Sequence, residues 1–465
     1  MQNKNTRPAN DASRPLKLLI GILSIVLVAL LALAVVLKPS QQPGDPLLSA
    51  DGTTTAPMTE ETTQPTTEPT EPPMQKIATA TIGTTGDILM HERVLKSGLD
   101  SATGQYDYTS IFEYFAPYVQ EMDYGVGNME GTLCGADNGY KYSGYPCFNC
   151  PDAIVDAAKA AGFDMLLTAN NHAYDTRHAG LMRTQQVIAE KGLDYTGTMP
   201  DAEAVNYLVK DINGIRVGMS CYTYQTGKTS QGNKTINGIS MTAEDSPLIN
   251  SFDYNDLDSF YAKLGEEISE MKQLGAESIV VFIHWGDEYK TSPNSWQKKI
   301  GQQLCNMGVD VIVGGHAHVV QPIEVLTNEN DPDRNTLCLY SLGNAVSNIR
   351  YSSTRPAETE DGMLFTFTLA KYSDGSVIVE GLDVLSTWVN RHNNASGKEV
   401  FPIIPLDPKV EDWKTAFNLT DSTLAQAEAS LKRSQKILSE GLAAAQEFYA
   451  RQQQAHEEAL GMHQK

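Results

Sequence analysis

Two neighbouring stretches decide the fold: residues 278–289 read SIVVFIHWGDEY, and residues 309–318 read VDVIVGGHAH. Each contains a run of β-branched or aromatic apolar residues, which is typical of a buried strand. Each run leads into glycine and histidine, with His284 after the first run and His316 and His318 after the second. The polar stretch between them has the length of a helix, so the pattern predicts an α/β domain.

The same alternation of strands and helices extends over residues 77–405. It predicts further strands at residues 77–82, 163–168 and 336–340 and helices at residues 151–161 and 178–191. Two dipeptides, Asn213-Gly214 and Asp374-Gly375, lie between apolar runs and predict β-hairpins. Hairpins combined with βα alternation predict a mixed sheet, or two sheets packed together, with helices outside.

Polar residues that can bind a metal follow six of these apolar stretches. They are Asp87, Glu130, Asn171 with His172, His284, His316 with His318, and Asn344. Because ligands bind beyond the carboxyl ends of strands in α/β sheets, we expect these side chains to lie together. Carboxylate, amide and imidazole groups favour Mn, Zn or Fe over a metal that prefers thiolates.

Each of these residues also has an ordinary explanation when it is taken alone. An aspartate after a strand often caps a helix, as Asp87 could. Glu130 could be a surface carboxylate, and His284 could be a core histidine with satisfied hydrogen bonds. The His-x-His after two glycines is the more specific feature, because glycine lets the backbone approach a ligand closely. The whole set therefore favours a metal site.

Composition excludes some functions. The 465 residues include 35 Lys and Arg against 57 Asp and Glu, which gives a net charge of -22. Nucleic-acid binding requires a basic surface, so a nucleic-acid partner is not expected. Six cysteines are too few for a disulfide-based fold in a chain of this length.

The N-terminal region predicts a membrane anchor. The apolar run from Leu18 to Leu37 has 20 residues, enough for a helix about 30 Å long. Basic residues precede the run, so the positive-inside rule places residues 1–17 in the cytoplasm and the main domain outside the cell. A cleaved signal peptide is the alternative, but its apolar region is usually shorter. We therefore predict a single-pass protein of the cell membrane.

Two further segments flank the main domain. Residues 38–76 are rich in Thr, Pro and Glu and are predicted to be a disordered linker. Residues 406–465 are predicted to form a helical C-terminal extension with Leu424, Leu431 and Leu438 at heptad spacing. Ser434 and Gly441 weaken the other side of this stripe. The helix could pack on its own domain, or it could bind a partner.

Six short motifs resemble one known family. They are GD at 86–87, NMEG at 128–131, ANNHAYD at 169–175, HWGDEY at 284–289, GGHAHVVQPIE at 314–324 and SLGN at 341–344. In this order they resemble the CapA family of capsule synthesis proteins linked to poly-γ-glutamate. The resemblance implies a metallophosphoesterase-type (calcineurin-like) domain over residues 77–405. Its fold would be a four-layer αββα sandwich located outside the cell.

The resemblance also implies roles for individual residues. The metal ligands would be Asp87, Glu130 in place of a bridging aspartate, Asn171, His284, His316 and His318. His172, oriented by Asp175, would contact a substrate oxyanion as the catalytic group. Asn128, His91 and Asn344 would support the ligands or contact the substrate. The usual Asp-x-His motif is absent, since the first histidine after Asp87 is His91, and this favours one bound divalent ion over two.

Two functions remain open from the sequence. A metal-dependent hydrolase could act on a phosphoester, or on an amide or ester of an anionic capsule polymer, by activating water at the ion. Alternatively, the domain could be a non-catalytic scaffold that helps polymer synthase or export subunits in capsule synthesis, export or retention.

Overall fold

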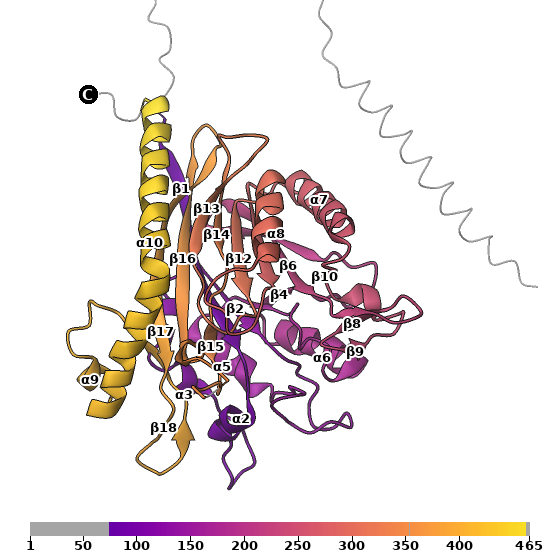
Figure 1. Ribbon diagram of the computed structural model, residues 1–465, viewed down its shortest axis with the longest axis vertical. Coiled ribbons are helices and arrows are strands. Elements are labelled where there is room, and N and C mark those ends of the chain that lie inside the picture. Colours follow the sequence, from indigo (N-terminus) through magenta and orange to yellow (C-terminus); the bar gives the residue numbers. More distant parts are fainter. Residues whose placement is uncertain (1–73, 353, 462–465) are drawn as a thin grey trace, which may run out of the picture. The chain divides into compact units, whose positions relative to one another are not determined.

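The computed structural model describes residues 74–352 and 354–461 (Figure 1). The predicted cytoplasmic segment (residues 1–17), the predicted membrane helix (residues 18–37) and nearly all of the predicted linker lie outside these residues. Among the helices of the described ranges, none combines the length and the apolar character needed to cross a bilayer.

The first of two large sheets has eight strands and is built around β1 (Lys76–Ile88). Parallel neighbours follow on one side, whereas the other side is antiparallel. The strand order is β20 (Ile403–Pro405), β17 (Val377–Val389), β16 (Asp361–Tyr372), β1, β2 (Tyr124–Met129), β3 (Met165–Leu167) and β4 (Asp194–Thr196), and β15 (Asn344–Val346) also pairs with β1.

The second large sheet has seven strands and contains both stretches that open the sequence argument. Its order is β10 (Ser251–Phe252), β6 (Ile215–Tyr224), β11 (Ser278–His284), β12 (Val311–Gly315), β14 (Asn335–Leu339) and β13 (Ile323–Thr327), and β5 (Tyr207–Ile212) also pairs with β6. All pairs are parallel except those made by β5 and β13. Both predicted hairpins, β5–β6 and β16–β17, are confirmed.

The two sheets face each other across one hydrophobic core. On β11, Val280 and Phe282 point into this core together with Ile82 of β1. The alternate residues Ile279 and Val281 point to the other side, where they pack against helices. A strand buried on both faces has no polar alternation, which explains why the sequence of β11 is a continuous apolar run.

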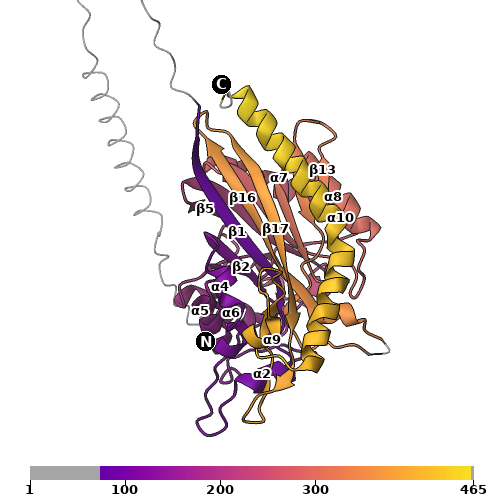
Figure 2. The ribbon, with the colours of Figure 1, turned by 90° about the vertical axis from the view of Figure 1, so that its left-hand side faces the viewer.

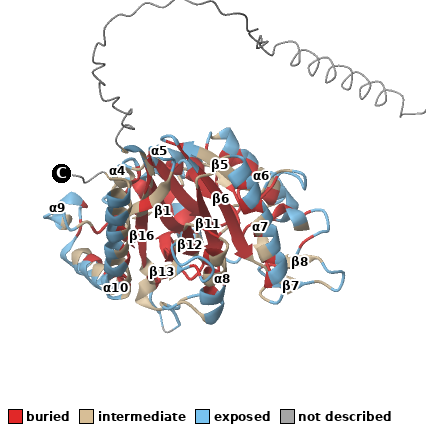
Figure 3. Ribbon diagram, turned by 90° about the horizontal axis from the view of Figure 1, so that it is seen from above, coloured by how far each residue is buried: buried red, intermediate tan, exposed pale blue. Residues whose placement is uncertain are grey.

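Helices cover the outer faces of both sheets. The first sheet is covered by α2 (Glu92–Gly98), α3 (Thr109–Phe112), α4 (Ala116–Val119), α5 (Ala153–Ala161) and α6 (Arg177–Glu190), and the second by α7 (Leu257–Gln273) and α8 (Ser295–Asn306). Figure 3 shows buried strands in the middle and the exposed faces of α7, α8 and α10 around them. The predicted α/β class is therefore confirmed, with two mixed sheets.

The small elements include one sheet that the sequence did not predict. Strands β7 (Gly227–Lys228), β8 (Lys234–Ile236) and β9 (Ile239–Ser240) form it, and Ile236 and Met241 pack it near α6. A two-stranded hairpin, β18 (His392–Asn393) with β19 (Glu399–Val400), precedes the C-terminal region. The remaining short elements are η1 (Ser246–Leu248), η2 (Ala357–Glu360) and α9 (Trp413–Ala416).

The C-terminal extension is helical, as predicted, and α10 (Asp421–Ala459) packs on its own domain (Figures 1 and 2). It contacts β17 of the first sheet and β13 of the second, so it connects the two sheets along one edge. Leu438 and Tyr449 enter the core between the sheets. Arg433 donates to both carboxylate oxygens of Asp361, at 2.6 and 2.8 Å. Of the two alternatives for this helix, the packed arrangement is the one observed.

Candidate metal centre

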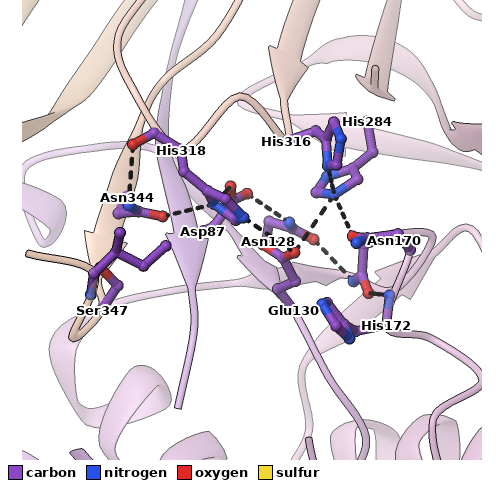
Figure 4. A network of polar contacts seen from close by, with 12 residues as sticks. Asp87, Asn128, Glu130, Asn170, His172, His284, His316, His318, Asn344 and Ser347 are labelled. Atoms are coloured by element: carbon purple, nitrogen blue, oxygen red, sulfur yellow. Dashed lines mark hydrogen bonds and ion pairs between the residues drawn. The ribbon is translucent and has the colours of Figure 1, made fainter. Parts of the chain in front are cut away.

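The predicted site residues meet where strands of both sheets end (Figure 4). The structure brings together Asp87, Asn128, Glu130, Asn171, His172, His284, His316, His318 and Asn344, and all of them are buried. Asp175 is also buried, behind His172, whereas His91 lies on the wall of an adjoining cavity. The expectation that these strand ends converge is thus met by the geometry.

A carboxylate–imidazole group formed by Asp87, Glu130 and His318, called the triad below, is the most compact part of the site. One ligand atom from each residue lies within 4.8 Å of the other two. The His318 Nδ1 atom is 3.3 Å from Asp87 Oδ2, and His318 Nε2 is 3.9 Å from Glu130 Oε1. Two carboxylates and one imidazole are suitable ligands for a divalent ion.

Three of the four carboxylate oxygens of the triad lack hydrogen-bond donors in the described structure. Within the described residues, neither oxygen of Glu130 nor the Oδ2 of Asp87 has a hydrogen-bond partner, although all three atoms are buried. Burying a carboxylate without a partner costs several kcal/mol, and buried polar atoms are nearly always satisfied. A bound cation would satisfy these oxygens, so the residues fit a divalent metal.

A second group of ligand atoms surrounds the imidazole of His284. Its Nε2 lies 2.8 Å from Asn171 Oδ1, 3.2 Å from His316 Nδ1 and 3.6 Å from Glu130 Oε1. These four side chains could hold an ion on the other side of Glu130. Only the triad brings three carboxylate or histidine ligands within 4.8 Å of one another among the described residues. The preference for one ion over two therefore stays a prediction.

Burial and neighbouring charges set the protonation of the histidines. Burial lowers the pKa of His318, but the charges of Glu130 and Asp87 outweigh it and raise this pKa to about 9. The pKa of His316 lies well below its usual value because of burial and the neighbouring His284 and His318. The site therefore favours a positive charge between the carboxylates, at the position where these residues would hold an ion.

Two asparagines hold the triad in place. The Asn128 side chain donates to Asp87 Oδ1 at 2.8 Å. Asn344 Oδ1 lies 3.0 Å from His318 Nδ1, and its amide donates to the backbone carbonyls of His318 and Thr359. Both asparagines therefore contact the triad directly, and the supporting role that the resemblance implies for them stays a prediction.

The strand that carries Asp87 is longer than predicted, and Asn344 lies in a further strand that the sequence did not predict. The strand expected at residues 77–82 continues to Ile88, so Asp87 lies within β1. Asn344 lies in β15, because the chain leaves the second sheet after β14 and pairs with β1 of the first. Gly86 permits this close approach, since a Cβ there would lie 2.0 Å from the carbonyl oxygen of Gly343. Polar and small residues at 83–86 concealed this buried part of the strand.

His172 is held by the residue expected to orient it. Its Nδ1 is 2.8 Å from Asp175 Oδ2, which also accepts the backbone N–H of Phe148 at 2.7 Å. Burial disfavours the charged imidazole, but the hydrogen bond and charge of Asp175 outweigh it and raise the pKa of His172. His172 is therefore positioned to carry a proton beside the triad.

His91 differs from the other predicted site residues. Its Nδ1 accepts the backbone N–H of Asn348 at 3.3 Å, and its ring packs edge-on against Phe148 at a centroid distance of 5.3 Å. Burial lowers the pKa of His91 to about 4. In the described part of the chain it forms no ion pair with Asp87 or Glu130, so a role toward the substrate stays a prediction.

Sequence reasoning missed two asparagines. Asn170 donates to the carbonyl of Met129 and accepts the backbone N–H of His172, so it connects the loops that carry Glu130 and His172. Asn237, at the turn between β8 and β9, places its amide 3.4 Å from His172 Nδ1. Asn170 lies inside a motif that the sequence already showed, whereas Asn237-Gly238 gave only a turn signal.

Backbone strain is concentrated at this site. Tyr289, His316 and His318 have φ values of 64, 86 and 55°, and Arg177, beside Asp175, has 58°. Apart from three asparagines, which tolerate this region, they are the only non-glycine residues with positive φ in the described ranges. Such conformations cost about 1–3 kcal/mol each and cluster at functional sites.

Comparison with known proteins agrees with this geometry. Residues 81–349, more than half of the chain, match the family described as "Bacterial capsule synthesis protein PGA_cap". The chain belongs to this family. The matched range begins within β1 and ends just after β15, so it includes every residue of the triad.

Two proteins of the genus Bacillus are also similar to this chain. The first is "PGA biosynthesis protein CapA" of Bacillus subtilis (strain 168), 29% identical over 348 residues, which cover 72% of this chain and 82% of the relative. The second is "Capsule biosynthesis protein CapA" of Bacillus anthracis, 28% identical over 278 residues. That alignment covers 59% of this chain and 61% of the relative.

Proposed function

We propose that this protein acts in the synthesis, export or retention of a capsule polymer of the poly-γ-glutamate type, as a metal-dependent hydrolase. The names of the two Bacillus relatives support the process. We further propose that the two sheets and their helices form the four-layer sandwich of metallophosphoesterases. The substrate would be a phosphoester, or an amide or ester of the polymer.

One observation carries the hydrolase part of this proposal. Both buried oxygens of Glu130 and the Oδ2 atom of Asp87 have no hydrogen-bond donors in the described structure, and they face His318. A protein that acts only as a scaffold gains nothing from buried carboxylate oxygens without hydrogen bonds, whereas a metal centre uses such oxygens as ligands. A divalent ion bound there would act as a Lewis acid and lower the pKa of a coordinated water toward neutrality.

The residues of the chain would then have separate tasks. Asn128 and Asn344 fix Asp87 and His318, so the ligands are already positioned before the substrate arrives. His172, whose Nδ1 is bound to Asp175, would hold a proton near the reacting group and give it to the departing oxygen or nitrogen. Burial of the site excludes bulk water and strengthens these interactions.

The test uses the full-length protein, stripped of metal and reloaded with Mn²⁺, Zn²⁺ or Fe²⁺. We expect metal to bind and to confer hydrolysis of bis(p-nitrophenyl) phosphate, p-nitrophenyl phosphate or a γ-glutamyl p-nitroanilide, and we expect EDTA to abolish it. Metal binding without turnover of any of these substrates would favour the scaffold function in a polymer synthase or export complex. Absence of metal after reconstitution would contradict the hydrolase.

The location of the protein is part of the proposal. We propose that residues 18–37 anchor the chain in the cell membrane and that the described domain lies outside the cell, on the basis of the apolar run and the basic residues before it. Protease added to intact protoplasts should therefore degrade the domain and leave the first 17 residues protected. A domain that is cleaved only after detergent lysis would refute this topology.

A further inference from the structure

A cavity of about 280 Å³ adjoins the metal centre. His172 and His318 form part of its wall on the side of the triad. The remaining wall includes the rings of Tyr145, Phe148 and Tyr289. A molecule bound at the triad would therefore extend into this cavity, whose wall combines aromatic rings with charged and polar side chains, among them Glu288 and Arg355.

Arg355 is the only lysine or arginine among the residues that line the cavity. Its side chain is exposed, and no carboxylate lies within 4 Å of it among residues 74–352 and 354–461. The whole chain carries a net charge of -22, so an arginine beside the candidate site that pairs with no carboxylate of the described residues stands out. A planar guanidinium with free donors is suited to bind a carboxylate or phosphate through two hydrogen bonds.

Tyr289 lies on the cavity wall together with Arg355 and the candidate metal ligand His318. Its ring faces the imidazole of His318, with a centroid distance of 6.1 Å. Burial and Glu288 raise the pKa of the Tyr289 hydroxyl to about 12, and Arg355 opposes the rise. Arg355 and the triad thus border the same cavity.

The position of Tyr289 is fixed by its backbone. Its N–H donates to the carbonyl of Ala317, between the two histidines of the His-x-His motif, at 2.7 Å. Its φ of 64° is a conformation that tyrosine adopts rarely. Strain of this kind persists only where the surrounding structure imposes it. The wall that Tyr289 shares with Arg355 is therefore rigidly attached to the loop of His316 and His318.

We propose that Arg355 recognises a second anionic group of the substrate, a carboxylate or a phosphate next to the group that reacts at the metal. This inference rests on the proposed hydrolase function and makes Arg355 the residue that selects a polyanionic substrate. Glu288, which lines the same cavity, is the competing acidic group inside the protein. The attraction of the anion by Arg355 and its repulsion by Glu288 then together set the affinity for the anion.

The test measures binding of two probes, inorganic phosphate and γ-L-glutamyl-L-glutamate, to the full-length protein by calorimetry, with and without saturating Mn²⁺. Because a hydrogen bond between charged groups is stronger than one between neutral groups, we expect Arg355→Leu to weaken the binding of at least one probe about tenfold or more. Arg355→Lys should retain part of the affinity, since it keeps the charge and loses the planar geometry. Glu288→Gln should tighten binding about twofold to threefold.

The probes and controls separate the possible outcomes. Sensitivity of phosphate binding to Arg355→Leu assigns a phosphate group, and sensitivity of dipeptide binding assigns a carboxylate. Mn²⁺ affinity should not change in any Arg355 variant, and Arg334→Leu, at a different cavity, should bind both probes like the wild type. Wild-type binding of both probes by Arg355→Leu would overturn the proposal. A wild-type protein that takes up no Mn²⁺ would instead contradict the hydrolase, and the metal-free comparison would still decide the role of Arg355.

Discussion

The double substitution Glu130→Gln and His318→Ala should abolish tight binding of Mn²⁺ or Zn²⁺ to this protein. The two residues supply two of the three ligand side chains of the triad. Glutamine keeps the volume of Glu130 but removes its charge, and alanine removes the imidazole, so only Asp87 of the triad would remain. The group around His284 would also lose its carboxylate, and the remaining ligands, a carboxylate fixed by Asn128 and neutral side chains, are too few to hold a divalent ion tightly.

The consequence should be measurable as a loss of metal-dependent stability. An ion that binds only the folded state stabilises it by about 2.7 kcal/mol at a hundredfold excess over its Kd. The melting temperature of the wild type should therefore rise as Mn²⁺ is added, whereas the melting temperature of the double variant should not change. Thermal unfolding monitored by circular dichroism at several Mn²⁺ concentrations provides the measurement.

Two controls make this comparison specific. Glu440→Gln with His456→Ala changes the same residue types on α10, outside the site, and should respond to Mn²⁺ like the wild type. Glu130→Gln alone keeps His318 and guards against a double variant that folds poorly. Equal responses of the wild type and Glu130→Gln to Mn²⁺ would remove Glu130 from the metal centre.

The parts of the fold that were predicted correctly are those in which local sequence and burial agree. The β11 strand is apolar on both faces because helices cover one face and the other sheet covers the other. The Asn213-Gly214 and Asp374-Gly375 turns also depend only on their own backbone requirements. In each case a single requirement explains the residues: burial on both faces for β11, and the backbone conformation of the turn for the two dipeptides.

The missed parts depend on contacts between distant segments. Thr84 and Thr85 are fully buried in β1 although they are polar, and Thr85 satisfies its hydroxyl by donating to the carbonyl of Met363 on β16. Asn344 follows β14 in sequence but belongs to the other sheet. The periodicity of the sequence shows neither the burial of these threonines nor the place of Asn344. The carbonyl that satisfies Thr85 lies 278 residues away, and the strand that pairs with Asn344 belongs to the other sheet.

The candidate site was easier to predict than the strands that carry it. Its residues are unusual at the ends of strands, so Asp87, Glu130 and His318 could be identified even though the end of β1 was placed too early. Asn237 could not be found in this way, because it comes from a small sheet that packs beside α6 and reaches His172 only through tertiary contacts. The role of Arg355 likewise depends on its place in the cavity, which no motif indicates.

The small residues of the C-terminal helix have a structural reason. Ser434 and Gly441 made its heptad stripe too weak for a coiled coil, and in the structure Ser434 is fully buried against the helix's own domain. A Cβ at Gly441 would lie 2.2 Å from the carbonyl oxygen of Ile323 on β13. The small residues are therefore the ones that allow α10 to approach the sheets closely.

This close approach predicts an unusual response to Gly441→Ala. In a helix, replacing glycine by alanine normally stabilises a protein by up to about 1 kcal/mol. Here the added methyl group would collide with a backbone atom of β13 that cannot rotate away, so α10 must shift and loosen the contacts of Leu438 and Tyr449. Overpacking of this kind costs about 1–3 kcal/mol, so we expect Gly441→Ala to lower the free energy of unfolding.

Gly265 in α7 provides the matched control. A Cβ at that position would meet only the Cε of Met307, at 3.8 Å, which is an ordinary contact. Gly265→Ala should therefore raise the midpoint of urea unfolding, whereas Gly441→Ala should lower it, although the chemical change is identical. The comparison cancels the intrinsic helix preference and leaves only the packing of α10 on β13. If both variants were stabilised equally, α10 would not lie against β13 in solution, and its assignment as a helix that connects the two sheets would be wrong.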